Sequence, residues 1–191
     1  MQTAAVFSVF MSSSLEESIR RESGGREPSQ VDRLCLDQAK AGDGLALLAP
    51  FTELISLSIQ DADISSLDSL PALNRLNTLK LNDNKIKGGL QNLERLPELQ
   101  KLYLASNKVQ SLECLQPLAK LTKLEWLDLE GNPVAKLDGY SQLVWDLLPS
   151  LVVLDGKNRD GQELEENEDD DESEEDEDEN NEDGEVVYNS V

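Results

Sequence analysis

The chain has 191 residues, 39 Asp and Glu against 17 Lys and Arg, a formal net charge of −22, and no histidine. This length allows one ordinary domain with a tail. The lack of histidine removes the commonest general base and the commonest zinc ligand. The acidic balance disfavours binding to nucleic-acid phosphates. Cys35 and Cys114 match no zinc or redox spacing, which indicates a reducing intracellular compartment.

The first segment, residues 1–14, carries a short apolar run without the basic start of a signal peptide. We expect a disordered extension here, with Met1 and Met11 both candidate start residues. No stretch of the sequence approaches the roughly 18 apolar residues that a membrane span needs, so no membrane partner is expected. Residues 15–22 (LEESIRRE) predict a short amphipathic helix that ends before Gly24 and Gly25.

A leucine pattern, L-x-x-L-x-L-x-x-N, recurs through the middle of the chain. It reads LNTLKLNDN at 76–84, LQKLYLASN at 99–107 and LEWLDLEGN at 124–132, with earlier versions at Val31 and Leu54 and an incomplete one at Leu151. A fixed period of about 20–29 residues is typical of a leucine-rich repeat solenoid. The predicted fold class is therefore α/β, with short parallel strands on the concave face, 3₁₀ or short helical returns on the convex face, and a cap at each end.

The segments between the strands and the residues that follow them support this architecture. Leucine or isoleucine at every third position, as in residues 64–73, favours a 3₁₀ return. Asparagine side chains at the turn after a strand can bond backbone groups that the turn leaves unpaired. These positions are Asn84, Asn107 and Asn132, whereas Ala39 and Ala62 replace them in the first two repeats. We expect the front of the solenoid to be less regular for this reason.

The C-terminal part divides into a cap and a tail. We assign the repeat domain to residues 15–161, with its C-terminal cap at about 137–161, where Leu143, Trp145 and Leu148 should cover the last strand. Residues 162–185 contain seventeen Asp or Glu and no Lys or Arg, which leaves 39 − 17 = 22 acids and a net charge of about −5 elsewhere. Such a block cannot bury enough apolar surface to offset its chain entropy, so we expect 162–191 to be a disordered interaction tail.

The densest acids of the tail flank Ser173, a candidate phosphorylation site because acids follow it. These acids are Glu168, Asp169, Asp170, Asp171, Glu172, Glu174, Glu175, Asp176, Glu177, Asp178 and Glu179.

The strand residues that alternate with the buried leucines should face the concave side. The candidate partner-binding residues there are Lys80, Lys101, Tyr103, Trp126, Asp128 and Glu130. By register, Lys101 should lie beside Trp126 and Tyr103 beside Asp128. Exposed aromatic rings next to carboxylates fit a basic, partly apolar segment. The alternative is that Trp126 folds over Lys101 and merely covers the sheet.

Two local sequences give a more specific resemblance. LKLNDNKIKGGL at 79–90, LLPSLVVLDGKNRDG at 147–161 and the adjoining acid tail resemble the acidic leucine-rich nuclear phosphoprotein 32 family, from about Pro28 onward. The resemblance implies histone chaperoning, masking of histone tails, chromatin or transcription regulation, phosphatase inhibition and RNA-binding-protein partners. Family members often end in a basic nuclear-import motif, whereas this chain ends GEVVYNSV.

The sequence and the resemblance together favour a monomeric, non-enzymatic adaptor of core histones or other basic proteins, in nucleus and cytoplasm. We expect no cofactor, no metal and no direct nucleic-acid binding. The rival hypothesis is an inhibitor or targeting subunit of a serine/threonine phosphatase that acts through the concave face. A ribonucleoprotein scaffold is a third hypothesis, but such a scaffold does not need a polyacid.

Overall fold

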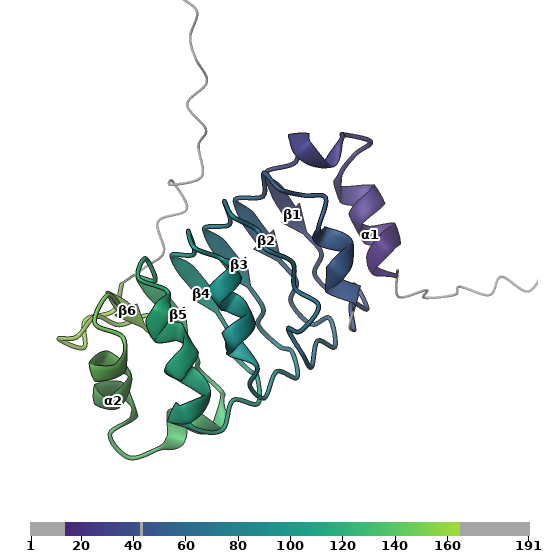
Figure 1. Cartoon of the computed structure of the whole chain (residues 1–191). Coiled ribbons are helices and arrows are strands. Elements are labelled where there is room, and N and C mark those ends of the chain that lie inside the picture. The colour runs from purple at the N-terminus through teal and green to yellow at the C-terminus, as the bar shows by residue number, and fades with distance from the viewer. Residues whose placement is uncertain (1–13, 43, 165–191) are drawn as a thin grey trace, which may run out of the picture.

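The computed structural model describes residues 14–42 and 44–164. Six parallel strands form one sheet in the order β1-β2-β3-β4-β5-β6. The strands are β1 (Arg33–Cys35), β2 (Ser56–Ser58), β3 (Thr78–Lys80), β4 (Lys101–Tyr103), β5 (Trp126–Asp128) and β6 (Val153–Leu154). They stack in chain order between α1 (Leu15–Glu22) at one end and α2 (Tyr140–Leu147) at the other (Figure 1). This arrangement confirms the predicted leucine-rich repeat solenoid.

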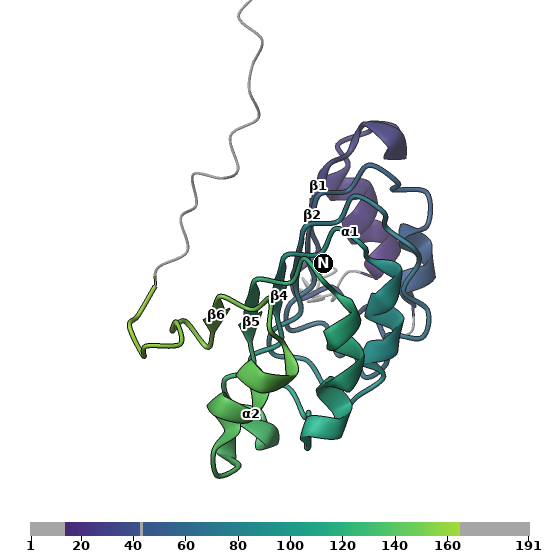
Figure 2. The same ribbon diagram turned by 60° about the vertical axis from the view of Figure 1, so that its left-hand side comes forward.

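The core lies between the sheet and the returns, because each repeat turns its leucines inward. The middle residue of each of the first five strands is leucine and is buried: Leu34, Leu57, Leu79, Leu102 and Leu127. A single three-residue strand could not bury such a side chain by itself, so stacking of the repeats creates the core. Figure 2 shows the sheet on one side of this core and the helical returns on the other.

Most returns are 3₁₀ helices, as the three-residue spacing of leucine and isoleucine predicted. They are η2 (Gly44–Leu48), η3 (Leu90–Arg95), η4 (Leu112–Lys120) and η5 (Pro133–Lys136), and a further short one, η1 (Pro28–Gln30), precedes β1. The return between β2 and β3 differs, since residues 61–77 form turns and bends without a helix. Ile64, Leu67, Leu70 and Leu73 are nevertheless buried, so the spacing placed these side chains correctly but overstated the helix.

The asparagines after the strands join neighbouring repeats, which confirms their predicted structural role. The Asn107 amide donates to the carbonyls of Leu81 at 2.9 Å and Leu104 at 3.0 Å, and its oxygen accepts the Ile86 N–H at 3.0 Å. Asn84 and Asn132 make the equivalent bonds one repeat earlier and one later. Each amide therefore satisfies buried backbone groups of two successive turns.

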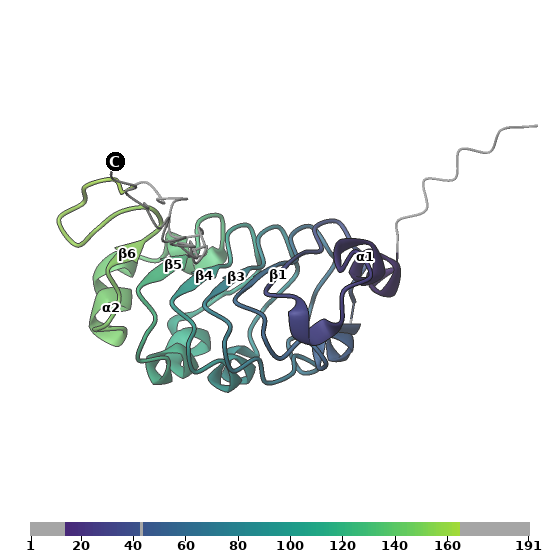
Figure 3. The ribbon, with the colours of Figure 1, turned by 90° about the horizontal axis from the view of Figure 1, so that it is seen from above.

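The N-terminal end of the solenoid is covered by α1, as predicted. Ser14 caps this helix, since its hydroxyl accepts the Glu17 N–H at 3.3 Å. Leu15 is buried in the same core as β1. Figure 3 shows α1 and α2 at opposite ends of the stacked coils. Residues 1–13 of the expected N-terminal extension lie outside the described residues.

The C-terminal end is covered by α2 and by the chain that follows β6. Trp145 and Leu148 are buried, as expected for the cap, but the prediction for Leu143 was wrong, because its side chain is 43% exposed. The helix instead turns Tyr140 and Val144 inward, one helical turn apart. Hydrogen bonding continues past residue 161, since the Leu164 N–H donates to the Gly156 carbonyl at 2.8 Å.

Candidate functional site on the open sheet face

The outward-pointing residues of the strands form one continuous surface, here called the open sheet face, which corresponds to the predicted concave face. Parallel pairing aligns Lys101 with Trp126 and Tyr103 with Asp128, as the register predicted. Lys80 pairs with Tyr103 on the other side. Five of the six predicted partner-binding residues therefore lie on three neighbouring strands. Glu130 follows two positions after Asp128, where its N–H donates to the Asp128 carboxylate at 3.0 Å.

Two aromatic rings occupy the centre of this face. The ring centroids of Tyr103 and Trp126 are 6.2 Å apart, with 34° between the planes. The Lys80 ammonium lies 5.2 Å from the centre of the Tyr103 ring, within the range of a cation–π contact. Trp126 is partly exposed, but Tyr103 is only 6% exposed, so the expectation of an exposed tyrosine was wrong. Its neighbours on both adjacent strands cover it, and Trp126 is the aromatic side chain that a partner could reach.

Carboxylates gather at the β5–β6 end of the face. Burial raises the pKa of Asp128, and the negative charge of Glu130 adds to the effect. Burial also raises the pKa of Asp155, directly after β6, although Asp155 accepts the Leu129 N–H at 2.7 Å. Sequence reasoning did not select Asp155 as a site residue. The sequence signal that could have identified it is its position directly after the apolar run LVVL and before Gly156, which marks the end of a strand.

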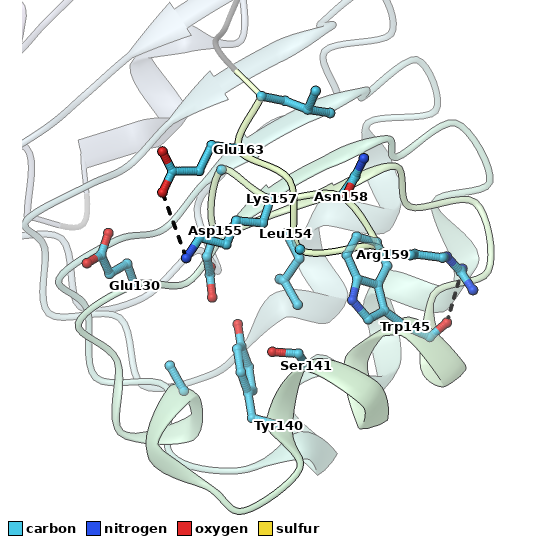
Figure 4. Close-up of a pocket in the computed structure, with 14 residues that line it drawn as sticks. Glu130, Tyr140, Ser141, Trp145, Leu154, Asp155, Lys157, Asn158, Arg159 and Glu163 are labelled. Atoms are coloured by element: carbon cyan, nitrogen blue, oxygen red, sulfur yellow. Dashed lines mark hydrogen bonds and ion pairs between the residues drawn. The ribbon is translucent and has the colours of Figure 1, made fainter.

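A groove of about 770 Å³ lies behind these carboxylates, between α2 and the chain after β6. Its lining includes Glu130, Tyr140, Trp145 and Asp155, and Figure 4 shows the Tyr140 hydroxyl pointing toward Asp155. No hydrogen bond of standard geometry joins the two groups, yet burial and the Asp155 charge together raise the pKa of Tyr140. Since Tyr140 and Trp145 belong to the buried core, we interpret this groove as part of the C-terminal cap.

Arg159 and Trp145 hold the outer wall of that cap. The Arg159 guanidinium lies 5.1 Å from the centre of the Trp145 ring and donates to the Trp145 and Pro149 carbonyls at 3.4 and 3.3 Å. Trp145 is 7% exposed, so it packs in the cap as predicted and is not available as a contact residue.

The front of the open sheet face is polar. Both Asp37 carboxylate oxygens accept hydrogen bonds: one from the Ser58 hydroxyl and the Gln60 N–H, the other from the Gln60 amide. Asn82 donates to Gln60 at 3.1 Å and continues this row of side chains. Cys35 is exposed here, yet the partial burial of its sulfur, together with the nearby Asp37 charge, raises the pKa of its thiol. A hydrogen bond from the Asp37 backbone acts in the opposite direction and is outweighed. A raised pKa lowers the thiolate fraction, which favours an incidental rather than a reactive cysteine.

The predicted acids of the tail and the candidate phosphorylation site Ser173 lie outside the described residues. Among residues 14–42 and 44–164, no helix is long and apolar enough to cross a membrane. Within the same ranges, no group of three or more His, Cys, Asp or Glu could hold a metal ion.

The raised pKa values lead to a prediction about pH. A carboxyl whose pKa is higher in the folded than in the unfolded chain opposes folding once it is ionised. At pH values below 3.8, the usual pKa of aspartate, the carboxyl is protonated in both states and does not destabilise the fold. At pH values above the raised folded-state pKa, the full destabilisation is present.

We therefore expect the free energy of unfolding to fall as pH rises from about 4 to 7, and we expect the substitution Asp128→Asn to reduce that fall. Urea unfolding at several pH values measures the free energy of unfolding of both proteins. Asp138→Asn, at an exposed position, is the control; parallel curves for wild type and Asp128→Asn would contradict the prediction.

Comparisons with known proteins agree with this fold. The family described as leucine-rich repeat matches residues 46–182. The acidic leucine-rich nuclear phosphoprotein 32 family member A of Drosophila pseudoobscura pseudoobscura is 36% identical over 149 residues, which are 78% of this chain and 57% of the relative. The same-named protein of Drosophila melanogaster is 35% identical over 151 residues, 79% of this chain and 58% of the relative. The chain thus spans somewhat more than half the length of these curated relatives.

Solved structures show the same architecture. A chain of the Drosophila melanogaster SNF/U2A′ complex has a TM-score of 0.51 and 34% sequence identity, with 60% of this chain and 63% of that chain covered. An internalin of Listeria monocytogenes has a TM-score of 0.52 at 18% identity, with 73% and 54% covered, and shows the fold alone. With its repeats, caps and sequence matches, the chain is a leucine-rich repeat protein that belongs to the acidic leucine-rich nuclear phosphoprotein 32 family.

Proposed function

We propose that this protein is a non-enzymatic adaptor or chaperone that binds core histones or other basic proteins in the nucleus and takes part in chromatin or transcription regulation. The observation that carries the proposal is the β5–β6 end of the open sheet face. There the partly exposed ring of Trp126 lies on the same strand as Asp128, with Glu130 and Asp155 beside it.

This arrangement suits a lysine or arginine side chain of a partner. An aromatic ring attracts a cation to its face, and the stem of the side chain packs on the ring. Burial raises the pKa values of Asp128 and Asp155, so each of these two carboxylates is poorly solvated when ionised. A partner cation would compensate that charge, and binding should be strongest where the carboxylates are ionised.

The acid tail begins at the same end of the sheet. Lys157 and Glu163 form an isolated antiparallel β-bridge, and the Leu164 N–H donates to the Gly156 carbonyl. The last described residues therefore lie against the chain that leaves β6. Residues 165–185 follow with sixteen of the seventeen tail acids. The open sheet face would select the partner, and the tail would neutralise its lysine-rich segments and compete with nucleic acid for them. The names of the curated relatives, which call them nuclear phosphoproteins, support the compartment and make Ser173 a candidate phosphorylation site.

Neutralising the tail should weaken histone binding. Replacing the eleven Asp and Glu within 168–179 by Asn and Gln keeps chain length and leaves the cap intact. We expect association with core histones to slow roughly 10- to 1,000-fold at low salt, because charge steering is lost. The intact protein should show a steep salt dependence and the neutralised protein a shallow one. Stopped-flow association across a salt series provides the measurement.

A deletion of residues 165–191 serves as the second variant, since it ends after the last cap hydrogen bond at Leu164. Its circular dichroism and melting temperature should match those of the full chain. Histone association that is equally fast and equally salt-dependent in all three proteins would defeat the proposal.

The alternative function, inhibition or targeting of a serine/threonine phosphatase, is favoured by one observation. Trp126 and the two lysines Lys80 and Lys101 lie on three neighbouring strands of the open sheet face, within the repeat domain. If Trp126→Ala abolishes inhibition of a phosphatase while the neutralised tail leaves it unchanged, the regulator function is supported instead.

A further inference from the structure

The groove in the C-terminal cap brings together side chains from three parts of the chain. Tyr140 and Trp145 come from α2, Asp155 directly follows β6, and Glu130 lies two residues after β5. The volume of the groove, about 770 Å³, falls within the roughly 300–1,000 Å³ of usual ligand sites. Figure 4 shows the acidic and aromatic side chains around it. The groove is therefore large enough to take a side chain of a partner with part of its backbone.

Asp155 is a half-buried acceptor in this groove. One oxygen of its carboxylate accepts the Leu129 N–H at 2.7 Å. Burial raises the pKa of Asp155, and the negative charges of Asp128 and Glu130 raise it further. The nearby Leu129 N–H and Tyr140 hydroxyl act in the opposite direction and are outweighed. A cation stabilises an ionised carboxylate in such surroundings, so Asp155 favours a positively charged ligand.

The Tyr140 hydroxyl is a second polar group beside the groove. Tyr140 is 6% exposed, and its hydroxyl points toward Asp155 (Figure 4). Within residues 14–42 and 44–164, this hydroxyl has no partner with standard hydrogen-bond geometry. A buried hydroxyl without such a bond costs free energy, and hydrogen bonds to ionised groups are stronger than neutral ones. The hydroxyl is therefore placed to donate to the Asp155 carboxylate once a cation favours the ionised form.

Two cations that line the groove are engaged with other groups. The Arg159 guanidinium lies over the Trp145 ring and donates to the Trp145 and Pro149 carbonyls. The Lys157 ammonium lies 4.0 Å from the Glu163 carboxylate, and both of these side chains are exposed. Both cations therefore bond or neutralise groups other than Asp155.

The kind of cation follows from the groups around Asp155. An arginine guanidinium is best matched by a carboxylate that offers both oxygens to a bidentate pair. At Asp155, the Leu129 N–H already occupies one oxygen, and the Tyr140 hydroxyl approaches the same carboxylate. A lysine ammonium needs only one oxygen, and its aliphatic stem can pack on the apolar lining that Trp145 and Leu154 provide. A lysine side chain therefore fits the groove better than an arginine side chain.

We propose that the groove binds a lysine side chain of a basic partner, whose ammonium pairs with Asp155 while the Tyr140 hydroxyl donates to the same carboxylate. Glu130 adds negative charge on the side next to β5. Tyr140 is a positioning residue, because it acts through Asp155. The inference deepens the proposed function and rests on it for the class of partner: one basic residue of the partner lies over Trp126, and a lysine enters the cap.

Titration of the full-length protein with a short peptide tests the groove directly. The probe is the capped peptide acetyl-Gly-Ala-Lys-Ala-Gly-amide, and two control peptides carry arginine or glutamine in place of the lysine. Backbone amide chemical shifts are followed at about 0.15 M salt, where the Debye length is about 8 Å. We expect the lysine peptide to cause saturable shifts in α2 and in residues 154–164. The arginine peptide should bind at least about threefold more weakly, and the glutamine peptide should cause no saturable shift.

A pair of matched substitutions separates the proposed contact from general attraction to an acidic protein. Asp155→Asn keeps an acceptor for the Leu129 N–H and suits the φ of 51° at this position, since asparagine tolerates the left-handed region. It should weaken binding of the lysine peptide at least about tenfold, because a hydrogen bond to a charged group is lost. Asp146→Asn, at an exposed position of α2, makes the same change of charge and should leave the affinity unchanged.

Tyr140→Phe removes only the hydroxyl and keeps the buried ring. We expect the lysine peptide to bind this variant about two- to tenfold more weakly. The melting temperature should stay the same or rise, since the hydroxyl has no partner of standard geometry in the part of the chain that the structure describes. A tyrosine with a purely structural role would instead lose stability without a selective loss of lysine binding.

Equal affinities for the lysine peptide and either control peptide, or equal effects of Asp155→Asn and Asp146→Asn, overturn the inference. Unchanged binding of the lysine peptide to Tyr140→Phe overturns it as well. Association with core histones keeps the two proposals distinguishable. Histones that bind wild type and Tyr140→Phe equally, with the steep salt dependence retained, leave the proposed function standing and remove this inference. Binding of the lysine peptide in the groove without any histone binding supports the inference and defeats the proposed function.

Discussion

Replacing Leu102 by alanine should lower the free energy of unfolding by about 2–5 kcal/mol. Leu102 is the middle residue of β4, is 0% exposed and pairs with Leu79 on one side and Leu127 on the other. Truncation removes apolar contacts in the centre of the stack and leaves a cavity that parallel strands on both sides prevent from closing. Urea unfolding followed by circular dichroism gives the change.

The matched control for this substitution is Leu47→Ala. Leu47 lies in η2 and is 46% exposed, so the same change in side chain should cost well under 1 kcal/mol there. Because a solenoid is stabilised by contacts between neighbouring repeats, Leu102→Ala should also broaden the transition. Equal stabilities of the two variants would mean that the stacked leucines do not form the stabilising core.

Asn107→Ala should destabilise the protein by about 2–4 kcal/mol, through hydrogen bonds rather than packing. The side chain is buried and makes four bonds to backbone groups of two turns. Without it, the buried Ile86 N–H loses its acceptor. The carbonyls of Leu81 and Leu104 each lose one of two asparagine donors, since Asn84 and Asn132 bond them as well.

Asn74→Ala is the control for the asparagine, because it removes the same amide from an exposed turn. In thermal and urea unfolding, the free energy of unfolding of Asn74→Ala should lie within about 0.5 kcal/mol of the wild-type value. If Asn107→Ala behaved like Asn74→Ala, the asparagine ladder would not contribute to stability. The alanines at positions 39 and 62 already occupy the equivalent places in the first two repeats, where both are buried. Hydrogen exchange should therefore be faster at the front of the solenoid than at Asn84 to Asn132.

The repeat pattern made the fold predictable to the level of single strands. Leucines at fixed spacing must share one side of each coil, so the strand register followed from their alignment, and Lys101 beside Trp126 followed from the register. The capping helix at Leu15–Glu22 was predictable because its signals, the amphipathic LEESIRRE pattern and the two glycines Gly24 and Gly25 after it, act locally. The eleven acids within 168–179 and Ser173 could be named from composition alone, and they lie outside the described residues.

The candidate site was predictable only in part, because exposure on the sheet depends on neighbouring strands. Alternation placed Tyr103 on the open sheet face, but Lys80 and Trp126 from the flanking repeats cover it. Asp155 was missed because it joins the Asp128 region only when β6 pairs with β5. In the cap, the inward side of α2 was misassigned at Leu143, since the orientation of a single short helix is set by its contact with the last coil.

The sequence by itself determined the solenoid, its strand register, its capped ends and the separation of a mildly acidic repeat domain from a polyacid, because these follow from residue spacing and charge along the chain. Only the tertiary structure decided which outward side chains a partner can touch and where the half-buried carboxylates gather. These properties depend on side chains that are 20 or more residues apart in sequence and meet across parallel strands.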